Sequence, residues 1–340
     1  VEKIGDGTLN LTAANSYTGL TTITAGALNI GNDTALGTTA AGTVVGAAAA
    51  LEIQGVNIVV GAEALTLAGS GISNGGALRN ISGDNTYGGA ITLTANSRIN
   101  SDAGTLMLSG ATTGTGRALT IGGAGNVTRT GALNTGAGGT LIKDGAGTLT
   151  LGNVPSNYTG ATTINAGVVN IQNATALGTT AAGTTVAGGA ALQVEGGIIV
   201  AEALTLNGAG IDSDGALRNI SGTNTLSGAV VLGSATRINS DAGTLTLSGT
   251  TTGTGLALTI GGDGNITRTG ALNTAAGGTL TKDGAGTLIL NVASNYQGLT
   301  TISAGVVSVR NNTGFGTIAG GVTVVDGAAL EIQGASALSI

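Results

Sequence analysis

The side chains that could carry out acid–base chemistry are carboxylates, because the 340-residue chain contains no histidine and no cysteine. Hydrolysis of a glycosidic bond needs two carboxyl groups that converge on it, and the candidates are Glu52, Glu63, Asp102 and Glu202. Glu63 and Glu202 hold equivalent places in repeated sequence, as do Asp102 and Asp241. Sugar clefts favour aromatic platforms, but aromatic residues make up 1% of this chain. We therefore predict surface carboxylates and no catalytic residue.

A nucleophile-elbow motif, G-x-S-x-G, is matched by residues 71–75 (GISNG). That motif needs a strand-to-helix turn and a histidine base. The equivalent residues 210–215 read GIDSDG, which breaks the spacing. The sequence therefore predicts an ordinary turn at this point.

Aspartates beside glycines raise the question of a calcium site. Residues 261–265 (GGDGN) resemble a fragment of the calcium-binding nonapeptide, but their counterpart at 122–126 (GGAGN) lacks the aspartate, and no tandem copies follow. Asp212 and Asp214 could ligate calcium from a turn, whereas the first copy has Ser73 and Asn74 there. We predict solvated turn residues, no metal site and no bound cofactor.

Two further sets of polar residues have alternative interpretations. Stacked asparagines can form hydrogen-bonded ladders along a solenoid, or they can be isolated surface residues, and the candidates are Asn10, Asn29, Asn134, Asn170 and Asn273. The Lys-Asp pairs at 143–144 and 282–283 are interpreted as local turn charges rather than as a binding site.

The elements that would position these residues are short β-strands. In residues 147–151 (GTLTL) apolar and polar side chains alternate, and the same period of two recurs throughout the chain. This period is typical of a strand with one buried face. Leu149 and Leu151 are predicted to point inward and Thr148 and Thr150 outward. Gly, Asn and Ser between the strands form turns, so the fold class is all-β.

A long repeat of about 140 residues organises the chain. Residues 98–106 (RINSDAGTL), for example, recur unchanged at 237–245. The copies are residues 1–142, 143–281 and a partial third at 282–340, and we predict that residues 1–340 form one continuous β-helix. Short strands of this kind must stack on neighbours like themselves, in rungs of roughly 20 to 24 residues. The third copy is predicted to have a shortened rung near 335–338.

Each copy opens with one signature: G-x-G-T-L-x-L, an asparagine, Tyr-x-Gly, and then T-T-I-x-A-G. It resembles the autotransporter-associated β-strand repeat, also called the passenger-associated transport repeat, of type V secreted bacterial proteins. The matching residues are Gly5, Gly7, Thr8, Leu9, Tyr17, Gly19, Thr22, Ile23 and Gly26 in the first copy, with equivalents from Gly145 to Gly167 and from Gly284 to Gly305. The resemblance implies a right-handed parallel β-helix at the cell surface of a Gram-negative bacterium. It implies no substrate and no catalytic residue.

Composition narrows the possible partners. The net charge is -6 and the eleven Lys and Arg residues are scattered, which argues against nucleic-acid binding. No segment is apolar enough to insert into a membrane. We expect an excerpt of a longer protein that is a non-catalytic stalk or surface fibre, whose partners are its own neighbouring rungs. The alternatives are an adhesin that binds host or matrix glycans or proteins, a self-assembling extracellular filament and, least favoured, a polysaccharide-acting enzyme.

Overall fold

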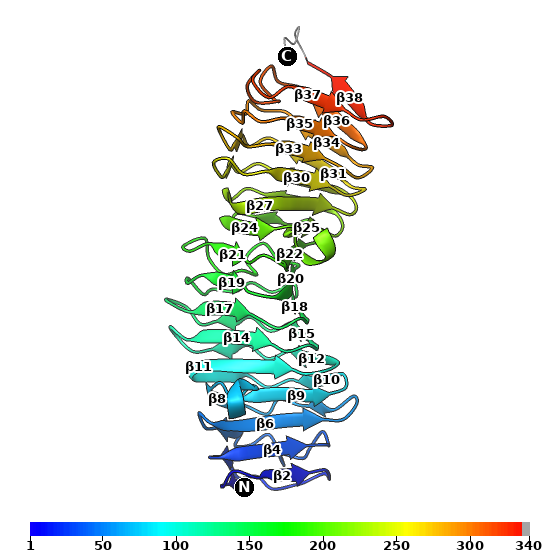
Figure 1. The fold of residues 1–340 in the computed structure, drawn as a ribbon. Helices are drawn as coiled ribbons and strands as arrows, with labels where there is room; N and C mark the ends of the chain where they lie inside the picture. The colour runs from blue at the N-terminus through cyan, green and yellow to red at the C-terminus, as the bar shows by residue number, and fades with distance from the viewer. Residues whose placement is uncertain (335–340) are drawn as a thin grey trace. The chain divides into compact units, whose positions relative to one another are not determined.

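The computed structural model describes residues 1–334 and groups them into two compact units. Unit 1 comprises residues 1–169 and 175–182, and unit 2 comprises residues 170–174 and the described residues from 183 onward. Within each unit the strands are short and pair in parallel, one rung above the next (Figure 1). The predicted all-β class and parallel β-solenoid are therefore confirmed. The prediction of a single continuous β-helix with three long repeats stays a prediction.

The strands of unit 1 are two to eleven residues long. In chain order they are β1 (Glu2–Lys3), β2 (Thr8–Leu11), β3 (Thr21–Ile23), β4 (Gly26–Ile30), β5 (Thr43–Val45), β6 (Ala49–Gln54), β7 (Val59–Val60), β8 (Leu65–Gly69), β9 (Leu78–Ser82), β10 (Asn85–Tyr87), β11 (Ile91–Ser101), β12 (Thr105–Leu108), β13 (Thr112–Thr113), β14 (Ala118–Gly122), β15 (Asn126–Arg129), β16 (Leu133–Asn134), β17 (Thr140–Lys143), β18 (Thr148–Leu151) and β19 (Thr162–Ile164).

One strand, β20 (Gly167–Ile171), contributes residues to both units. The strands that follow it are β21 (Thr184–Val186), β22 (Ala190–Val194), β23 (Ile199–Val200), β24 (Leu204–Gly208), β25 (Leu217–Asn219), β26 (Thr223–Leu226), β27 (Val230–Ser240), β28 (Thr244–Leu247), β29 (Thr251–Thr252), β30 (Leu258–Gly261), β31 (Asn265–Arg268), β32 (Leu272–Asn273), β33 (Leu280–Lys282), β34 (Thr287–Leu290), β35 (Thr300–Ile302), β36 (Val306–Val309), β37 (Val322–Val324) and β38 (Ala329–Ile332).

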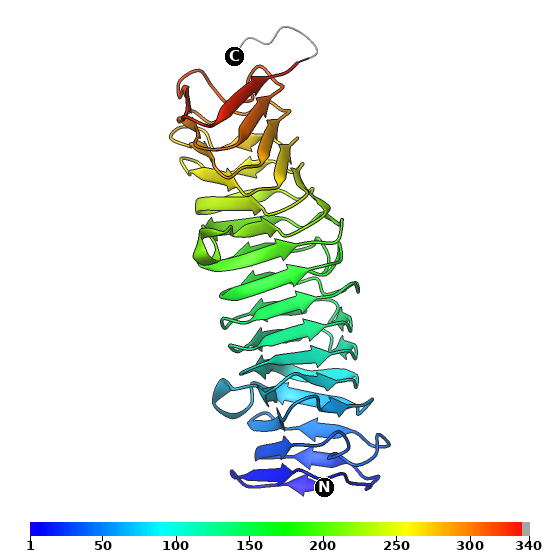
Figure 2. The ribbon, with the colours of Figure 1, turned by 90° about the vertical axis from the view of Figure 1, so that its right-hand side faces the viewer.

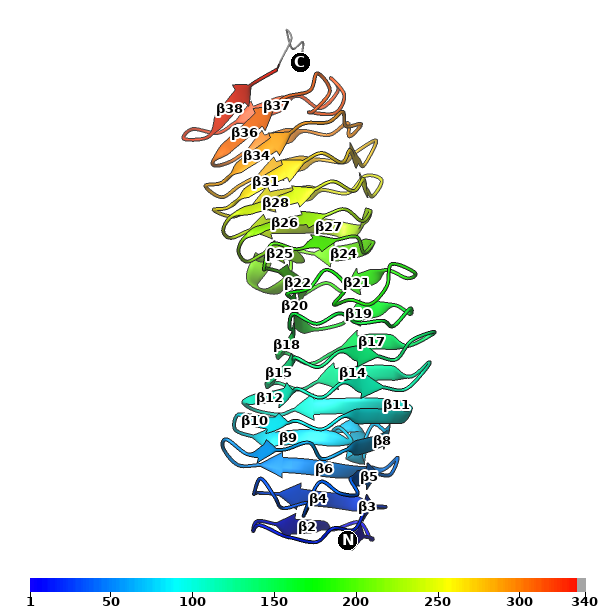
Figure 3. The same cartoon turned by 180° about the vertical axis from the view of Figure 1, so that it is seen from behind.

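The core of unit 1 is a column of inward-facing aliphatic side chains. Strands β12, β15 and β18 lie one above another (Figure 3), with Leu106 paired to Val127 and Val127 paired to Leu149. All three side chains are buried. Leu151 is also buried, while Thr148 and Thr150 are partly exposed. The predicted inward and outward faces of this strand are confirmed.

Unit 2 repeats this arrangement in the stack β26, β28, β31, β34, β36 and β38 (Figure 3). Leu245 pairs with Ile266, Ile266 with Leu288, and Leu288 with Val307, and all four are buried. Because every second residue faces inward, each rung adds aliphatic side chains to the same column.

Rung length varies where a loop is inserted. Leu106 and Val127 are 21 residues apart, within the predicted range, whereas Ile53 and Asn80 are 27 apart. The longer rung contains the 3-10 turn η1 (Ile72–Asn74), which projects from the side of unit 1 (Figure 2). Unit 2 has the equivalent turn η2 (Ile211–Ser213). The rung predicted to shorten near 335–338 lies outside the described residues.

Helical structure is confined to these two 3-10 turns within residues 1–334. No helix in that part of the chain has the length and apolar character needed to cross a membrane.

Candidate functional site

A lysine stands two residues before the first glycine of each signature, at Lys3, Lys143 and Lys282, and we count it with the signature. All three lysines are buried. The ammonium Nζ of Lys143 donates hydrogen bonds to the carbonyl oxygens of Asp144 at 2.7 Å, Gly145 at 2.7 Å and Ala166 at 3.2 Å. Lys3 and Lys282 each contact three equivalent carbonyl groups. Lys143 and Lys282 were interpreted as local turn charges, and two acceptors of each do lie in the turn. Both lysines are nevertheless buried, and the third acceptor of each belongs to the next rung, an arrangement that we call the lysine corner.

The glycine that ends the signature makes this corner possible. Gly167 has φ +68°, a conformation that disfavours residues with a Cβ. A Cβ on it would lie 2.4 Å from the Gly147 oxygen and 2.8 Å from Nζ of Lys143. Gly26 has the same φ and the same close neighbours around Lys3. Lysine and glycine in the signature are therefore parts of one contact.

The signature tyrosine forms the other fixed contact. The Tyr158 hydroxyl hydrogen-bonds Oγ1 of Thr162 at 2.7 Å, and both side chains are fully buried. Tyr296 and Thr300 repeat this at 2.7 Å, and burial raises the pKa of Tyr296 to about 12. The sequence showed these residues as a motif, and the structure shows that they cross-link the interior of each signature block.

Two carboxylates predicted to lie on the surface are buried. Glu63 is 3% exposed and accepts a hydrogen bond from Oγ1 of Thr43 at 2.9 Å, and Glu202 is 4% exposed and accepts one from Thr184 at 3.2 Å. Both glutamates face the apolar interior, so burial raises the pKa of each, and that of Glu202 rises to about 7. The surface assignment was wrong because Glu63 sits just before a strand, where period-two alternation does not determine its side.

We expect Glu202 to make stability depend on pH. Its pKa is about 7 in the folded chain and 4.5 ordinarily, so its contribution is fully present below about pH 4.5 and is lost as pH rises through 7. The loss reaches at most about 3 kcal/mol. Urea unfolding between pH 5 and 8 should show a loss of stability with rising pH that Glu202→Gln reduces, because glutamine does not ionise and keeps the acceptor for Thr184. Glu63, whose pKa is also raised, contributes to the slope that remains. Glu331→Gln, on an exposed strand, is the control. An unchanged slope in Glu202→Gln would contradict the assignment.

Two fully buried arginines were not anticipated. Nη2 of Arg129 donates to Oγ1 of Thr112 at 2.9 Å and to the Gly131 carbonyl at 3.2 Å, while its Nε and Nη1 have no partner. Arg268 repeats this geometry with Thr251. Desolvation lowers the pKa of both arginines to about 10. Strict alternation in residues 126–129 (NVTR) places Arg129 on the same face as Val127, and that signal could have revealed it.

Buried asparagines form a hydrogen-bonded network at positions other than the candidate ones. Nδ2 of the buried Asn80 donates to Oγ of Ser101 at 3.2 Å, and Nδ2 of Asn85 donates to Oδ1 of Asn80 at 2.8 Å. Asn219 and Asn224 repeat these contacts in unit 2. Among the candidates from the sequence, Asn10 and Asn29 pair in register on neighbouring strands. Asn29 and Asn170 each donate a hydrogen bond to a glutamine. Asn134 and Asn273 each pair with a threonine of the neighbouring strand.

The remaining candidate charges form ion pairs on the outer face. Arg98 binds both carboxylate oxygens of Asp144 at 2.7 Å, two rungs away. The ion pair passes over Gly122. A Cβ at this position would lie 2.1 Å from Nη2 of Arg98 and 2.1 Å from Oδ1 of Asp144. In unit 2 Arg237, Gly261 and Asp283 repeat this arrangement.

The other carboxylates from the sequence are dispersed. Glu52 and Asp102 both contact Arg79, at 3.3 and 2.6 Å. Asp212 lies within η2 and Asp214 pairs with Arg218 at 3.3 Å. No group of three or more metal-ligating side chains occurs in residues 1–334. The serine of the G-x-S-x-G match lies within η1, which is a turn as predicted.

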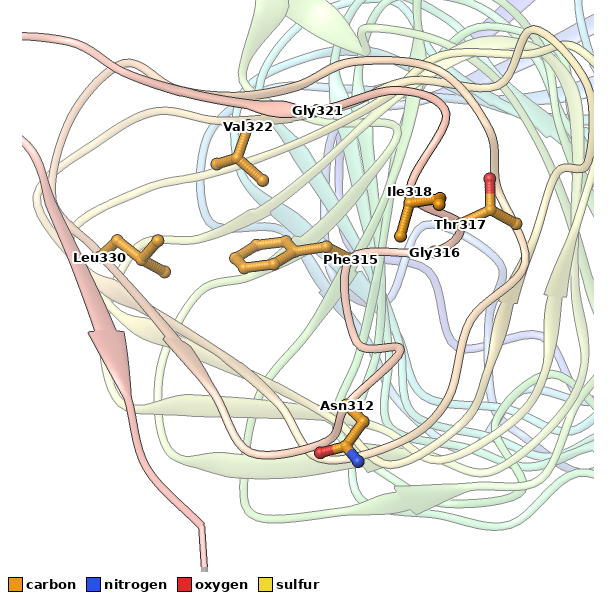
Figure 4. Close-up of a pocket in the computed structure, with 8 residues that line it drawn as sticks. All are labelled: Asn312, Phe315, Gly316, Thr317, Ile318, Gly321, Val322 and Leu330. Atoms are coloured by element: carbon orange, nitrogen blue, oxygen red, sulfur yellow. The ribbon is translucent and has the colours of Figure 1, made fainter. Parts of the chain in front are cut away.

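An apolar hollow in unit 2 is lined by Phe315, Ile318, Val322 and Leu330 (Figure 4). The counterparts of Val322 and Leu330 in unit 1 are Thr43 and Leu51, which are buried beneath β8 and β9. The hollow is thus a face that a further rung covers elsewhere in the molecule, and its polar side chains are those of Asn312 and Thr317.

Residues 1–30, 141–171 and 280–309 match the model of the passenger-associated-transport-repeat family. The chain carries three passenger-associated transport repeats. These are the segments in which a buried lysine, a positive-φ glycine and a tyrosine–threonine pair coincide. Such repeats belong to surface-exposed or secreted proteins of Gram-negative bacteria.

The chain is also similar to a protein of Brucella suis biovar 1 named adhesin BmaC autotransporter. The two are 34% identical over 169 residues, which is 50% of this chain and 4% of the relative. The chain therefore spans a small fraction of that protein's length. No solved structure matches the chain.

Proposed function

We propose that this segment is a non-catalytic structural stalk within an autotransporter passenger at the cell surface of a Gram-negative bacterium. The observation that carries the proposal is the repetition of the lysine corner at Lys3, Lys143 and Lys282. Each lysine donates two hydrogen bonds within its own turn and one to the next rung, which leaves no donor for a ligand. Contacts that recur at each long repeat serve to extend a solenoid, because each rung interacts only with its neighbours.

Charged groups elsewhere support the same role. The buried glutamates and arginines are repeated between the copies, and their hydrogen-bonded atoms face threonines of the same chain. The outer Arg98–Asp144 pair likewise has its equivalent in Arg237–Asp283. A catalytic centre would require a cluster of acid, base or nucleophilic side chains that occurs in one copy and not in the other.

Deletion of residues 143–281 from the full-length protein tests the proposal. The deletion joins Ile142 to Lys282, the equivalent of Lys143, so rung stacking continues in register. We expect normal display on cells, measured by accessibility to an added protease, and a circular dichroism spectrum of unchanged shape for the 201 residues that remain of this segment. Deletion of 143–270 is the matched control, because it joins Ile142 to Ala271 out of register and should abolish display. Failure of the in-register deletion to be displayed would contradict an interchangeable stalk.

Adhesion is the second candidate function, favoured by the similarity to a protein named as an adhesin. An adhesive site would depend on residues that differ between the copies, since the shared residues are occupied with internal contacts. Such a difference lies beside η1.

A further inference from the structure

A polar groove lies on the outer face of unit 1 beside η1. Its lining residues, which we call the copy-one groove, are Gly69, Ser70, Asn74, Asn96, Ser97, Arg98, Thr120, Ile142 and Asp144. Its floor is the outward face of strands β11, β14 and β17, where Arg98 pairs with Thr120 and Thr120 with Ile142. One wall is the loop around η1, and another is the exposed Asn96 within β11.

Two amide groups of the groove are held by internal hydrogen bonds that leave their N–H donors free. Oδ1 of Asn74 accepts a hydrogen bond from Oγ of Ser70 at 2.5 Å, and Oδ1 of Asn96 accepts one from the backbone N–H of Ala118 at 3.0 Å. With both oxygens occupied, each Nδ2 presents its two N–H groups to the groove. Both asparagines are exposed, so these donors are accessible to a ligand.

The charge in the groove is neutralised within the chain. Both Nη atoms of Arg98 bind the carboxylate of Asp144, at 2.7 Å each, and Nη2 also donates to Oδ1 of Asn100 at 3.0 Å. The groove thus offers amide donors and hydroxyl groups without a net charge, over a floor that includes methyl groups of Thr120 and Ile142. This chemistry fits a ligand that is rich in oxygen acceptors, uncharged and small.

The geometry points to an uncharged saccharide as the ligand of the copy-one groove, and we propose this assignment. A peptide fits less well, because the floor strands are paired on both sides within the solenoid and offer no free edge for strand addition. Protein partners usually anchor on aromatic or free arginine side chains, and the groove has neither. A saccharide would place hydroxyl oxygens against the amide donors and its C–H faces against the methyl groups.

The second copy supplies a natural control for this site. Its residues equivalent to Ser70, Asn74 and Asn96 are Ala209, Ser213 and Ala235. Its Arg237–Asp283 pair and the burial pattern of its long strand β27 match those of Arg98–Asp144 and β11. The two faces thus share a scaffold. They differ in the side chains that would bind the ligand and in Ser97 and Ile142, whose equivalents are Thr236 and Thr281. The chain itself shows that the substituted residues are compatible with the fold.

Saturation-transfer NMR on the 340-residue chain tests the proposal with lactose, cellobiose and N,N′-diacetylchitobiose as probes. Because no aromatic ring stacks on the sugar, we expect binding of at least one probe with a dissociation constant on the order of a millimolar. The triple variant Ser70→Ala, Asn74→Ser and Asn96→Ala should lose the signal by about tenfold or more. Grafting Ala209→Ser, Ser213→Asn, Ala235→Asn and Thr281→Ile into that variant should restore it. Circular dichroism confirms that each variant is folded.

The proposal is overturned if no probe gives a signal at roughly 10 mM, a concentration above the expected dissociation constant. It is also overturned if the folded triple variant binds as the unmodified chain does. Neither result bears on the stalk, which the deletion of 143–281 tests separately. That deletion replaces Asp144 by its equivalent Asp283 and leaves Ser70, Asn74 and Asn96 in place, so saccharide binding should survive it.

Discussion

Leu149→Asp should destabilise the chain by about 4 kcal/mol, whereas Thr150→Asp, one residue further on, should change stability by less than about 1 kcal/mol. Leu149 is fully buried above Val127, so its replacement places a carboxylate in the apolar column of unit 1. Thr150 lies on the outward face beside Thr128, where an aspartate remains hydrated. Urea unfolding followed by far-ultraviolet circular dichroism measures both variants.

The first copy provides a matched control at the same signature position. Leu9 is equivalent to Leu149 but is 36% exposed, and its strand β2 pairs with β4 alone. Leu9→Asp should therefore cost much less than Leu149→Asp, even though the local sequences agree. Similar losses in Leu149→Asp and Thr150→Asp would show that the faces are wrongly assigned. Similar losses in Leu9→Asp and Leu149→Asp would show that burial is not the cause.

Alternation and repetition predicted short strands that stack on like strands, and the resemblance to the passenger-associated transport repeat implied the β-helix. The period of two in residues 147–151 gave the inward side of β18, and the repeated signature indicated that rungs stack on like rungs. These features are local or periodic, so they can be read from one sequence. Rung length was less predictable, because the loop that contains η1 adds residues between Ile53 and Asn80 without interrupting their pairing.

The interior polar groups were largely missed, because their partners lie a rung or more away in the chain. Lys143 was interpreted as a turn charge. Its burial and its hydrogen bond to the Ala166 carbonyl, on the next rung, show that it faces inward. Arg129 and Glu63 were unexpected for a related reason, since charged residues are rarely buried without a charged partner and their partners are threonine hydroxyls. The copy-one groove also depends on spacing across rungs, because Asn74 and Asn96 are separated in sequence.

Lys143→Met should lower stability by about 3 kcal/mol at pH 7, the second large effect that we expect. Burial lowers the pKa of Lys143 from 10.5 to about 8, which corresponds to a cost of roughly 3 kcal/mol for holding the charge inside. Methionine removes that cost. It also leaves the carbonyl groups of Asp144, Gly145 and Ala166 without this donor, and each buried acceptor left unpaired costs about 1–3 kcal/mol. The loss of three hydrogen bonds is therefore larger than the stability gained by no longer burying a charge.

Arg117→Met separates this effect from the general loss of a cation. Arg117 is exposed, and its replacement should change stability by less than about 0.5 kcal/mol. Lys282→Met should reproduce the loss in unit 2, because Lys282 donates to Asp283, Gly284 and Ala304 in the same way. If both methionine variants are as stable as the unmodified chain, the lysine corner does not hold successive rungs together. The stalk would then depend on its aliphatic column alone, and the lysine of the signature would need another explanation.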